Sequence, residues 1–173
     1  MSHSLFLYTG SSGYLPDLVK VYREGKSNWV AYCQISETMT DITIASTNVT
    51  PFVKIDSEKS YIIFKGKSSP ANSLLFYHPL IVKIKSLFSD STQPITVELA
   101  FRYFNTSSSK CLFDLFKMLK GLKNQGKTLI INWHYEEDDD DMFETGEDYA
   151  EILGLDFNFV MDKEEERTLF LVA

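Results

Sequence analysis

The chain has 173 residues, of which 44% are hydrophobic and 24% charged, as expected of a folded domain rather than a disordered chain. Its formal net charge of −7 argues against a surface that binds DNA or RNA through phosphate contacts. No apolar run approaches the ~18 residues of a membrane span, and the N-terminus lacks the basic start and long apolar core of a signal peptide. The cysteines Cys33 and Cys111 show no metal-ligand spacing and are expected to be reduced. We therefore expect a soluble cytoplasmic protein.

The first part of the chain gives a mixed pattern. A strand is indicated at residues 5–8, a short helix at 15–23 and a strand at 29–35. We treat residues 1–49 as an N-terminal extension of unknown role. From residue 50 onward strand and helix patterns alternate, so residues 50–173 are expected to form the main domain.

Two short β-prone runs, at 53–55 and 61–64, are separated by the turn-rich letters DSEKS and predict a hairpin. After the breaker cluster KSSPANS, apolar residues recur at helical spacing from Tyr77 to Phe88, which predicts a helix with one buried face. Ser69 before Pro70 resembles an N-cap followed by proline at the first helical position. Pro79 predicts either a kink or a later start for this helix.

The second half has the clearest patterns. Strict alternation predicts half-buried strands at 95–104 and 129–135. Between them an apolar stripe over 112–122 predicts a helix, with Gly126 as its stop. A weaker helix is indicated at about 142–153, and short strands at 157–161 and 168–172. The predicted fold class is α/β, a mixed β-sheet with helices packed mainly on one face.

The acidity of the chain is concentrated in one run. Residues 136–148 read EEDDDDMFETGED and contain nine of the 24 acidic residues. Such a run should stay solvated unless a cation or a basic partner neutralises it. We interpret it as an exposed acidic loop. Two alternatives remain open: a docking surface for a basic partner, formed by Asp138, Asp139, Asp140 and Asp141, and a metal site. The spacing of a calcium loop is absent.

A run of hydroxyl residues, YFNTSSSK at 103–110, lies between a predicted strand and a predicted helix. One interpretation is capping, with Thr106, Ser107 or Ser108 as the residue that caps the helix. The other is a phosphoacceptor, because free N–H groups and the helix dipole at this end favour negative charge. Lys110 would then neutralise a phosphate or contact a kinase.

Catalytic chemistry has little support in the sequence. We interpret His78 and His134 as packed or rim histidines rather than catalytic bases. There is no G-x-S-x-G elbow and no legible Cys/His spacing. We expect a protein that is not an enzyme, with no catalytic residues, no cofactor and no resident metal.

Five segments together resemble a known family. They are GKSSPANS (66–73), FYHPL (76–80), YFNTSSSK (103–110), NWHYEEDD (132–139) and ETGEDY (144–149). In this order they are similar to the SiaC-like regulatory phosphoproteins of bacteria, and the resemblance extends from about residue 50 to the C-terminus. That family is similar in fold to the STAS domains of anti-sigma-factor antagonists, so the resemblance implies a STAS-like sheet.

The resemblance also implies a mechanism. Thr106 falls on the family's phosphoacceptor threonine, surrounded by Asn105, Ser107, Ser108 and Lys110. A partner kinase would phosphorylate it and a PP2C-type phosphatase would clear it. The unphosphorylated form would engage a downstream target, a diguanylate cyclase in the best-known case. Two features depart from the family: Ala71 stands where a glutamate usually follows the proline, and residues 1–49 have no recognised counterpart.

Two other functions remain open. A receiver-like protein would bind Mg²⁺ at the acidic run and accept phosphate on an aspartate. A plain scaffold would dock a basic partner through the acidic run, with Thr106 only a cap. The receiver-like protein is distinguished from the threonine switch by the acid stability of its phosphate, because phosphothreonine survives acid and an acyl phosphate does not. The scaffold is distinguished from the switch by Thr106→Glu, which should abolish partner binding only in the switch.

Overall fold

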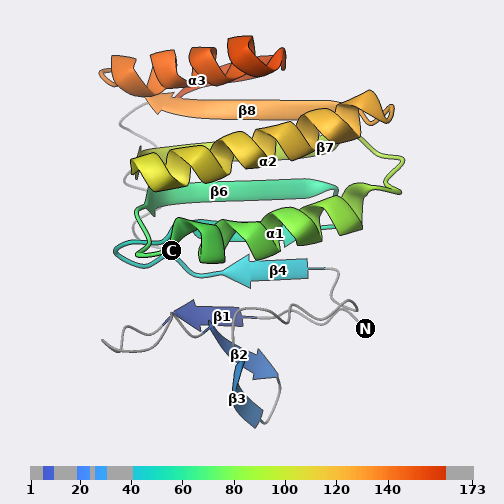
Figure 1. The fold of residues 1–173 in the computed structure, drawn as a ribbon, viewed down its shortest axis with the longest axis vertical. Helices are drawn as coiled ribbons and strands as arrows, with labels where there is room; N and C mark the ends of the chain where they lie inside the picture. The colour runs from blue at the N-terminus through green and yellow to red at the C-terminus, as the bar shows by residue number, and fades with distance from the viewer. Residues whose placement is uncertain (1–5, 10–18, 24–25, 31–40, 163–173) are drawn as a thin grey trace.

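The computed structural model describes residues 6–9, 19–23, 26–30 and 41–162, the first three segments by their backbone pairing only. The described strands form one sheet, and Figure 1 shows the helices lying on it and running roughly alongside its strands. In chain order the elements are β1 (Phe6–Thr9), β2 (Val19–Arg23), β3 (Lys26–Val30), β4 (Asp41–Ile44), β5 (Phe52–Asp56), β6 (Tyr61–Ser68), α1 (Ser73–Phe88), β7 (Ile95–Phe104), α2 (Thr106–Asn124), β8 (Leu129–Glu136), α3 (Asp140–Leu153) and β9 (Phe157–Asp162).

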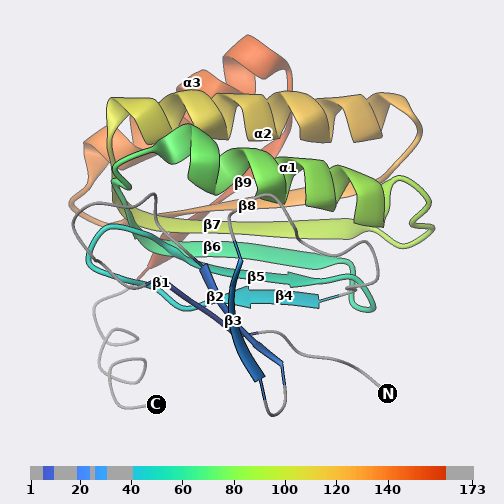
Figure 2. The ribbon, with the colours of Figure 1, turned by 60° about the horizontal axis from the view of Figure 1, so that its bottom comes forward.

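The described strands form a sheet in the order β3-β2-β1-β4-β5-β6-β7-β8-β9. Strands β4, β5 and β6 pair antiparallel, whereas β6, β7, β8 and β9 run parallel. Each parallel step from β6 to β9 crosses over through one helix, and the three helices of this part of the chain lie on the same face (Figure 2). The α/β prediction, a mixed sheet with helices mainly on one face, is confirmed.

The core lies between this sheet and its helices. Along β7 burial alternates, with Ile95, Val97 and Leu99 facing the helices, as a strand covered on one side requires. The same phase holds in β8, where Ile131 and Trp133 are buried. The largest fully buried side chains include Trp133, Tyr77, Phe64, Phe88 and Phe116. The strands predicted at 95–104 and 129–135 and the 53–64 hairpin are therefore confirmed.

The start of α1 corrects one prediction. Its N-cap is Asn72, whose side chain accepts a hydrogen bond from the Leu75 N–H at 3.0 Å, and not Ser69. The chain between them leaves β6, and the Ser69 N–H bonds the Val49 carbonyl. Pro79 lies inside the helix, so a start after the proline is also wrong.

Helix α2 follows its predicted stripe. Leu112, Leu115 and Leu119 are buried, and the helix ends where expected, with Gly126 in a left-handed conformation (φ +88°) just beyond it. Glycine adopts that conformation at little cost, so it is the usual residue past a helix end. None of the described helices has both the length and the apolarity needed to cross a bilayer.

The acidic run at 136–148 was predicted to be an exposed loop, but most of it belongs to helix α3. Only a short turn separates β8 from α3, and Asp140 and Asp141 lie in the first turn of that helix. Asp139 is the N-cap, its side chain accepting from the Met142 N–H at 2.9 Å. The helix N-terminus carries partial positive charge, which offsets the mutual repulsion of these carboxylates.

Strands also replace a predicted helix near the N-terminus. Residues 19–23 form β2, paired antiparallel with β1 and β3, whereas a helix was predicted over 15–23. The strands predicted at 5–8 and 29–35 overlap β1 and β3. Strand β4 was not predicted. Residues 15–18, 31–40 and the strand at 168–172 lie outside the described residues, and the domain division at residue 50 stays a prediction.

Candidate functional site

Three helix N-termini lie at one edge of the sheet. Strands β6, β7 and β8 are parallel, so the helices that follow them, α1, α2 and α3, all begin at the carboxyl ends of these strands (Figure 1). This edge is where open α/β sheets usually place binding residues. It gathers the segments that the sequence analysis selected, Thr106 at the start of α2 and Asp138–Asp141 around the start of α3.

Thr106 is the first residue of α2, and its side chain is exposed. The cap is Asn105, whose side chain accepts from the Ser108 N–H at 2.8 Å. The interpretation that Thr106, Ser107 or Ser108 caps the helix is therefore wrong. Among the described residues, no side chain forms a hydrogen bond with the Thr106 hydroxyl, which leaves that oxygen accessible beside the free N–H groups of the helix end.

The neighbouring hydroxyls are tied into a chain. Ser68 donates to Ser108 at 2.9 Å, so its other contact, with Tyr77 at 2.6 Å, must be donated by the tyrosine. Ser107 donates to the Asn105 side-chain oxygen at 2.9 Å. Each serine hydroxyl has one proton to donate, so Ser73 must donate to Ser107, and Ser108 must donate to Ser73. From donor to acceptor, the chain therefore runs Tyr77 to Ser68 to Ser108 to Ser73 to Ser107 to Asn105.

This hydroxyl chain links three elements near Thr106. Ser68 ends β6, Ser73 begins α1, and Ser107 and Ser108 lie in the first turn of α2. Hydrogen bonds in a row polarise one another, and here the last acceptor is the residue before Thr106. Burial raises the pKa of Tyr77, which keeps its hydroxyl protonated as a donor. Ser68, Ser73 and Tyr77 were not predicted as site residues, and the signal for them in the sequence is the serine-rich segment between a strand and a helix.

Helix α3 is held to the same turn. The Ser109 hydroxyl lies 2.7 Å from the Tyr149 hydroxyl, which also donates to the Ser109 carbonyl at 3.1 Å. Burial raises the pKa of Tyr149, and the bond to Ser109 only partly opposes it. The first turn of α2 is thus fixed on one side by α1 and on the other by α3.

The charge around Thr106 is mixed. Lys110 is exposed and lies four residues along α2, so it shares a helix face with Thr106. Lys67, near the end of β6, lies over the ring of Tyr103, 5.6 Å from its centroid. Around the start of α3, Asp138, Asp140 and Asp141 are exposed and Asp139 is half-buried.

Apolar side chains are also exposed near this edge. Leu74 and Leu75, in the first turn of α1, are 62% and 42% exposed, and Tyr103 is 51% exposed. Ala71 is exposed just before this helix. The edge therefore combines an accessible hydroxyl, apolar side chains and both signs of charge, which suits protein recognition.

The other predicted residues lie elsewhere. His78 is exposed on α1, whereas His134 lies on the helix-free face of the sheet between two carboxylates. Cys111 is buried in α2 as a free thiol, as expected, and Cys33 lies outside the described residues. Within residues 41–162, the described part that carries side chains, no group of three or more His, Cys, Asp or Glu is placed to hold a metal ion.

Residues 44–162 match the model of the SiaC family of regulatory phosphoproteins. The match covers more than half of the chain, and the chain belongs to this family.

Individual relatives agree with this assignment. The chain is 27% identical over 113 residues to an uncharacterized protein of Pseudomonas aeruginosa (strain UCBPP-PA14), which covers 65% of this chain and 90% of that protein. The structure of SiaC of Pseudomonas aeruginosa matches with a TM-score of 0.65 at 26% identity, over 72% of this chain and all of that one. A structure of the diguanylate cyclase SiaD in complex with its activator SiaC, from the same organism, matches with a TM-score of 0.67 at 25% identity, over 70% of this chain and all of the matched chain.

Proposed function

We propose that this regulatory phosphoprotein is a signalling switch without catalytic activity, in which Thr106 is the phosphoacceptor. A cognate protein kinase phosphorylates Thr106 and a PP2C-type phosphatase removes the phosphate. The unphosphorylated form binds and regulates a downstream target. The observation that carries the proposal is that Asn105 caps α2, so the exposed Thr106 hydroxyl has no structural task that phosphorylation would disrupt.

The helix end suits a phosphate physically. A phosphate on Thr106 adds about −1.5 to −2 charges and three acceptor oxygens. Free N–H groups and the dipole at a helix N-terminus favour such an anion. Lys110, exposed on the same face, can pair with it. The cap and the hydroxyl chain do not include Thr106, so we expect the fold to tolerate the modification.

The same phosphate would oppose partner binding. A partner that covers Thr106, Leu74 and Tyr103, all exposed at this edge, would have to strip water from a dianion. Lys110 can offset only part of that charge, and removing water from the remainder still costs several kcal/mol. Phosphorylation therefore switches binding off without rearranging the fold.

A diguanylate cyclase is the proposed target class. SiaC of Pseudomonas aeruginosa is described as the activator of the diguanylate cyclase SiaD and has been solved in complex with it. The exposed carboxylates Asp138, Asp140 and Asp141, with the N-cap Asp139, lie at the same sheet edge. We assign them to the partner surface, where they would attract a basic patch on the target or on the kinase.

The test measures binding of the purified chain to a purified diguanylate cyclase from the same organism, by titration calorimetry. Thr106→Glu should weaken binding at least tenfold, while Thr106→Ala should bind like the wild type. Thr128→Glu is the matched control. Thr128 is exposed just before β8, so this substitution adds the same charge at the opposite edge of the sheet. Equal binding by all four proteins, or no binding by any, would contradict the proposal.

A kinase assay tests the modification itself. The wild type and Thr106→Ala are incubated with ATP and a cell extract from the source organism, and the phosphate is followed through acid treatment. Acid-stable phosphate that is lost in Thr106→Ala supports the switch. Acid-labile phosphate retained in that variant would instead indicate an aspartate-phosphorylated, receiver-like protein.

A further inference from the structure

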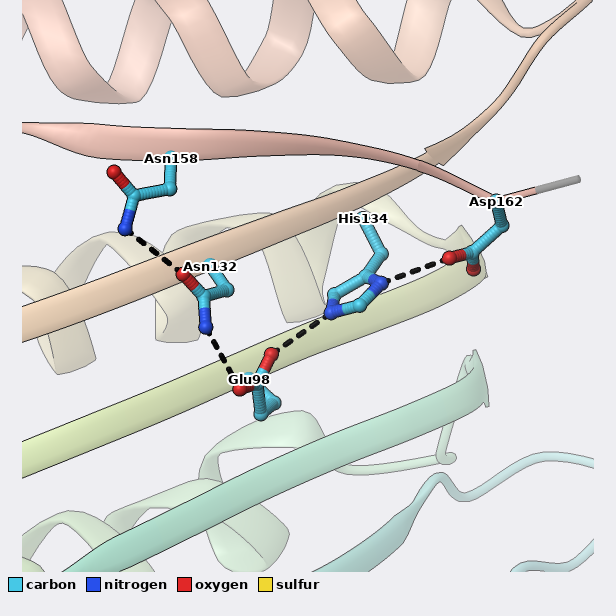
Figure 3. A network of polar contacts seen from close by, with 5 residues as sticks. All are labelled: Glu98, Asn132, His134, Asn158 and Asp162. Carbon is cyan, nitrogen blue, oxygen red and sulfur yellow. Dashed lines mark hydrogen bonds and ion pairs between the residues drawn. The ribbon is translucent and has the colours of Figure 1, made fainter.

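The helix-free face of the sheet carries a polar network across three strands. Figure 3 shows Glu98 on β7, Asn132 and His134 on β8, and Asn158 and Asp162 on β9. His134 lies between the two carboxylates, its Nε2 2.8 Å from Glu98 Oε2 and its Nδ1 2.9 Å from Asp162 Oδ1. The imidazole thus bridges a central strand to the last strand of the described sheet.

Both contacts require a doubly protonated ring. A neutral imidazole carries one N–H, and an ionised carboxylate can only accept. His134 can therefore donate to Glu98 and Asp162 together only as the imidazolium. Burial by itself lowers the pKa of His134, but the hydrogen bonds to Asp162 and Glu98 and the charges of both carboxylates outweigh it, so the pKa is raised.

The two carboxylates are held unequally. The other oxygen of Glu98 accepts from Asn132 Nδ2 at 2.7 Å, and Asn132 in turn accepts from Asn158. The Glu98 side chain is 16% exposed, whereas that of Asp162 is 41% exposed. Asp162 is the last residue of β9, and among the described residues His134 is its side-chain partner. Loss of one proton should therefore break the contact to Asp162 and keep the contact to Glu98.

Other charged or titratable groups lie on this face, but the contacts that raise the pKa of His134 are those with Asp162 and Glu98. By alternation along the strands, Arg102 of β7, Glu136 of β8, and Tyr61 and Lys65 of β6 share the face. Lys65 and Glu136 have interactions of their own, and burial, then the charge of Glu98, raises the pKa of Tyr61. On β9, the uncharged residue Val160 lies on this face between Asn158 and Asp162. The helices pack on the opposite face (Figure 2).

We propose that His134 is a proton-operated latch for the C-terminal end of β9. As the imidazolium it holds Asp162 against β8 and Glu98 against β7. When it loses a proton, the lone pair on Nδ1 faces the Asp162 carboxylate, the two repel, and the end of β9 separates from β8. The backbone pairs that open are those of the strand end, His134 with Val160, Tyr135 with Met161 and Glu136 with Asp162.

Amide hydrogen exchange, measured by NMR across the histidine titration, tests this latch. After correction for the intrinsic pH dependence of exchange, protection of the amides at 160–162 should fall several-fold as pH rises through the titration of His134. Protection in β7 should stay constant. Because the chain has three histidines, the His134 signal is assigned by its absence in His134→Gln.

Two variants and a control decide the outcome. His134→Gln should remove the step in protection, because glutamine does not titrate. Asp162→Asn should remove the step too and lower the pKa of His134; this site is partly exposed at a strand end, so the variant should fold. His78→Gln, at an exposed histidine on α1, should keep the step. Constant protection in the wild type, or a step that survives in His134→Gln, would overturn the proposal.

Discussion

The hydroxyl of Ser73, at the start of α1, lies 2.9 Å from the hydroxyl of Ser107 in the first turn of α2. This contact joins the buried half of the hydroxyl chain, at Tyr77, Ser68 and Ser108, to the helix cap at Asn105. The segment that carries Thr106 is therefore fixed from inside the core while Thr106 itself remains exposed. This fixed turn presents the Thr106 hydroxyl free of side-chain hydrogen bonds, whereas the exposed Ser107 hydroxyl is bonded to Ser73 and Asn105.

Removing the cap should weaken the fold. Asn105→Ala loses the acceptor for the Ser108 N–H and for the Ser107 hydroxyl, and loss of a helix cap costs about 0.5–2 kcal/mol. Urea unfolding should show a decrease in the free energy of unfolding within that range. Thr106→Ala, one residue away, should stay within about 0.5 kcal/mol of the wild type. A larger effect at Thr106 than at Asn105 would contradict the assignment of the cap.

The inner end of the hydroxyl chain should be more sensitive. Ser68→Ala leaves the buried Tyr77 hydroxyl without its acceptor and Ser108 without its donor. A buried polar group left without a partner costs about 1–3 kcal/mol, so the melting temperature should fall clearly. Ser69→Ala is the control, because no side-chain hydrogen bond involves Ser69 among the described residues. Equal stability of the two variants would argue against the chain.

Gly146 allows α3 to approach the sheet closely. A Cβ on this residue would lie 2.6 Å from Trp133 Nε1 and 2.8 Å from Phe159 Cε1. The same indole nitrogen donates to the Met142 carbonyl at 2.9 Å. Gly146→Ala should therefore push α3 outward and lower the free energy of unfolding by about 1–3 kcal/mol.

Gly121 in α2 provides the matched control for that substitution. A Cβ there meets no atom within 4 Å, so Gly121→Ala should raise helix propensity and stabilise the protein by up to about 1 kcal/mol. Thermal unfolding measured on the two variants in parallel should give shifts of opposite sign. A neutral Gly146→Ala would show that α3 does not pack as described.

Stability should also depend on pH through His134. Its folded pKa lies above the ordinary value of 6.5, so the folded state binds the proton more tightly than the unfolded chain. The resulting stabilisation is fully present below about pH 6.5 and is lost as pH rises through the folded pKa. The difference in free energy of unfolding between the wild type and His134→Gln should shrink over that interval. A difference that is constant or grows with pH would contradict the protonated assignment.

The parts of the fold that were predicted from sequence are those set by local periodicity. Strict alternation in β7 and β8 and the apolar stripe of α2 place one face of each element in the core, so the type and approximate position of each element follow directly. The start of α1 was misplaced because Ser69–Pro70 and Asn72–Ser73 both provide plausible caps, and only the path from β6 selects Asn72. The acidic run was assigned to a loop because charge repulsion was considered without the compensating helix dipole.

The candidate site was predicted only in part. Thr106 and its neighbours stood out because hydroxyl residues were concentrated between a strand and a helix. The partners of those hydroxyls, Ser68 and Tyr77, are brought in by packing between distant segments. The same holds for His134, whose carboxylate partners come from β7 and β9. Such juxtapositions depend on sheet order and register, which local patterns do not specify.

The most direct test of the account is to locate the phosphate on the chain isolated from its own cells, by peptide mass spectrometry under conditions that preserve acid-labile and acid-stable phosphate alike. The account predicts acid-stable phosphate on Thr106. Phosphate on Ser107 or Ser109 with Thr106 unmodified, or phosphate confined to an aspartate, would contradict it.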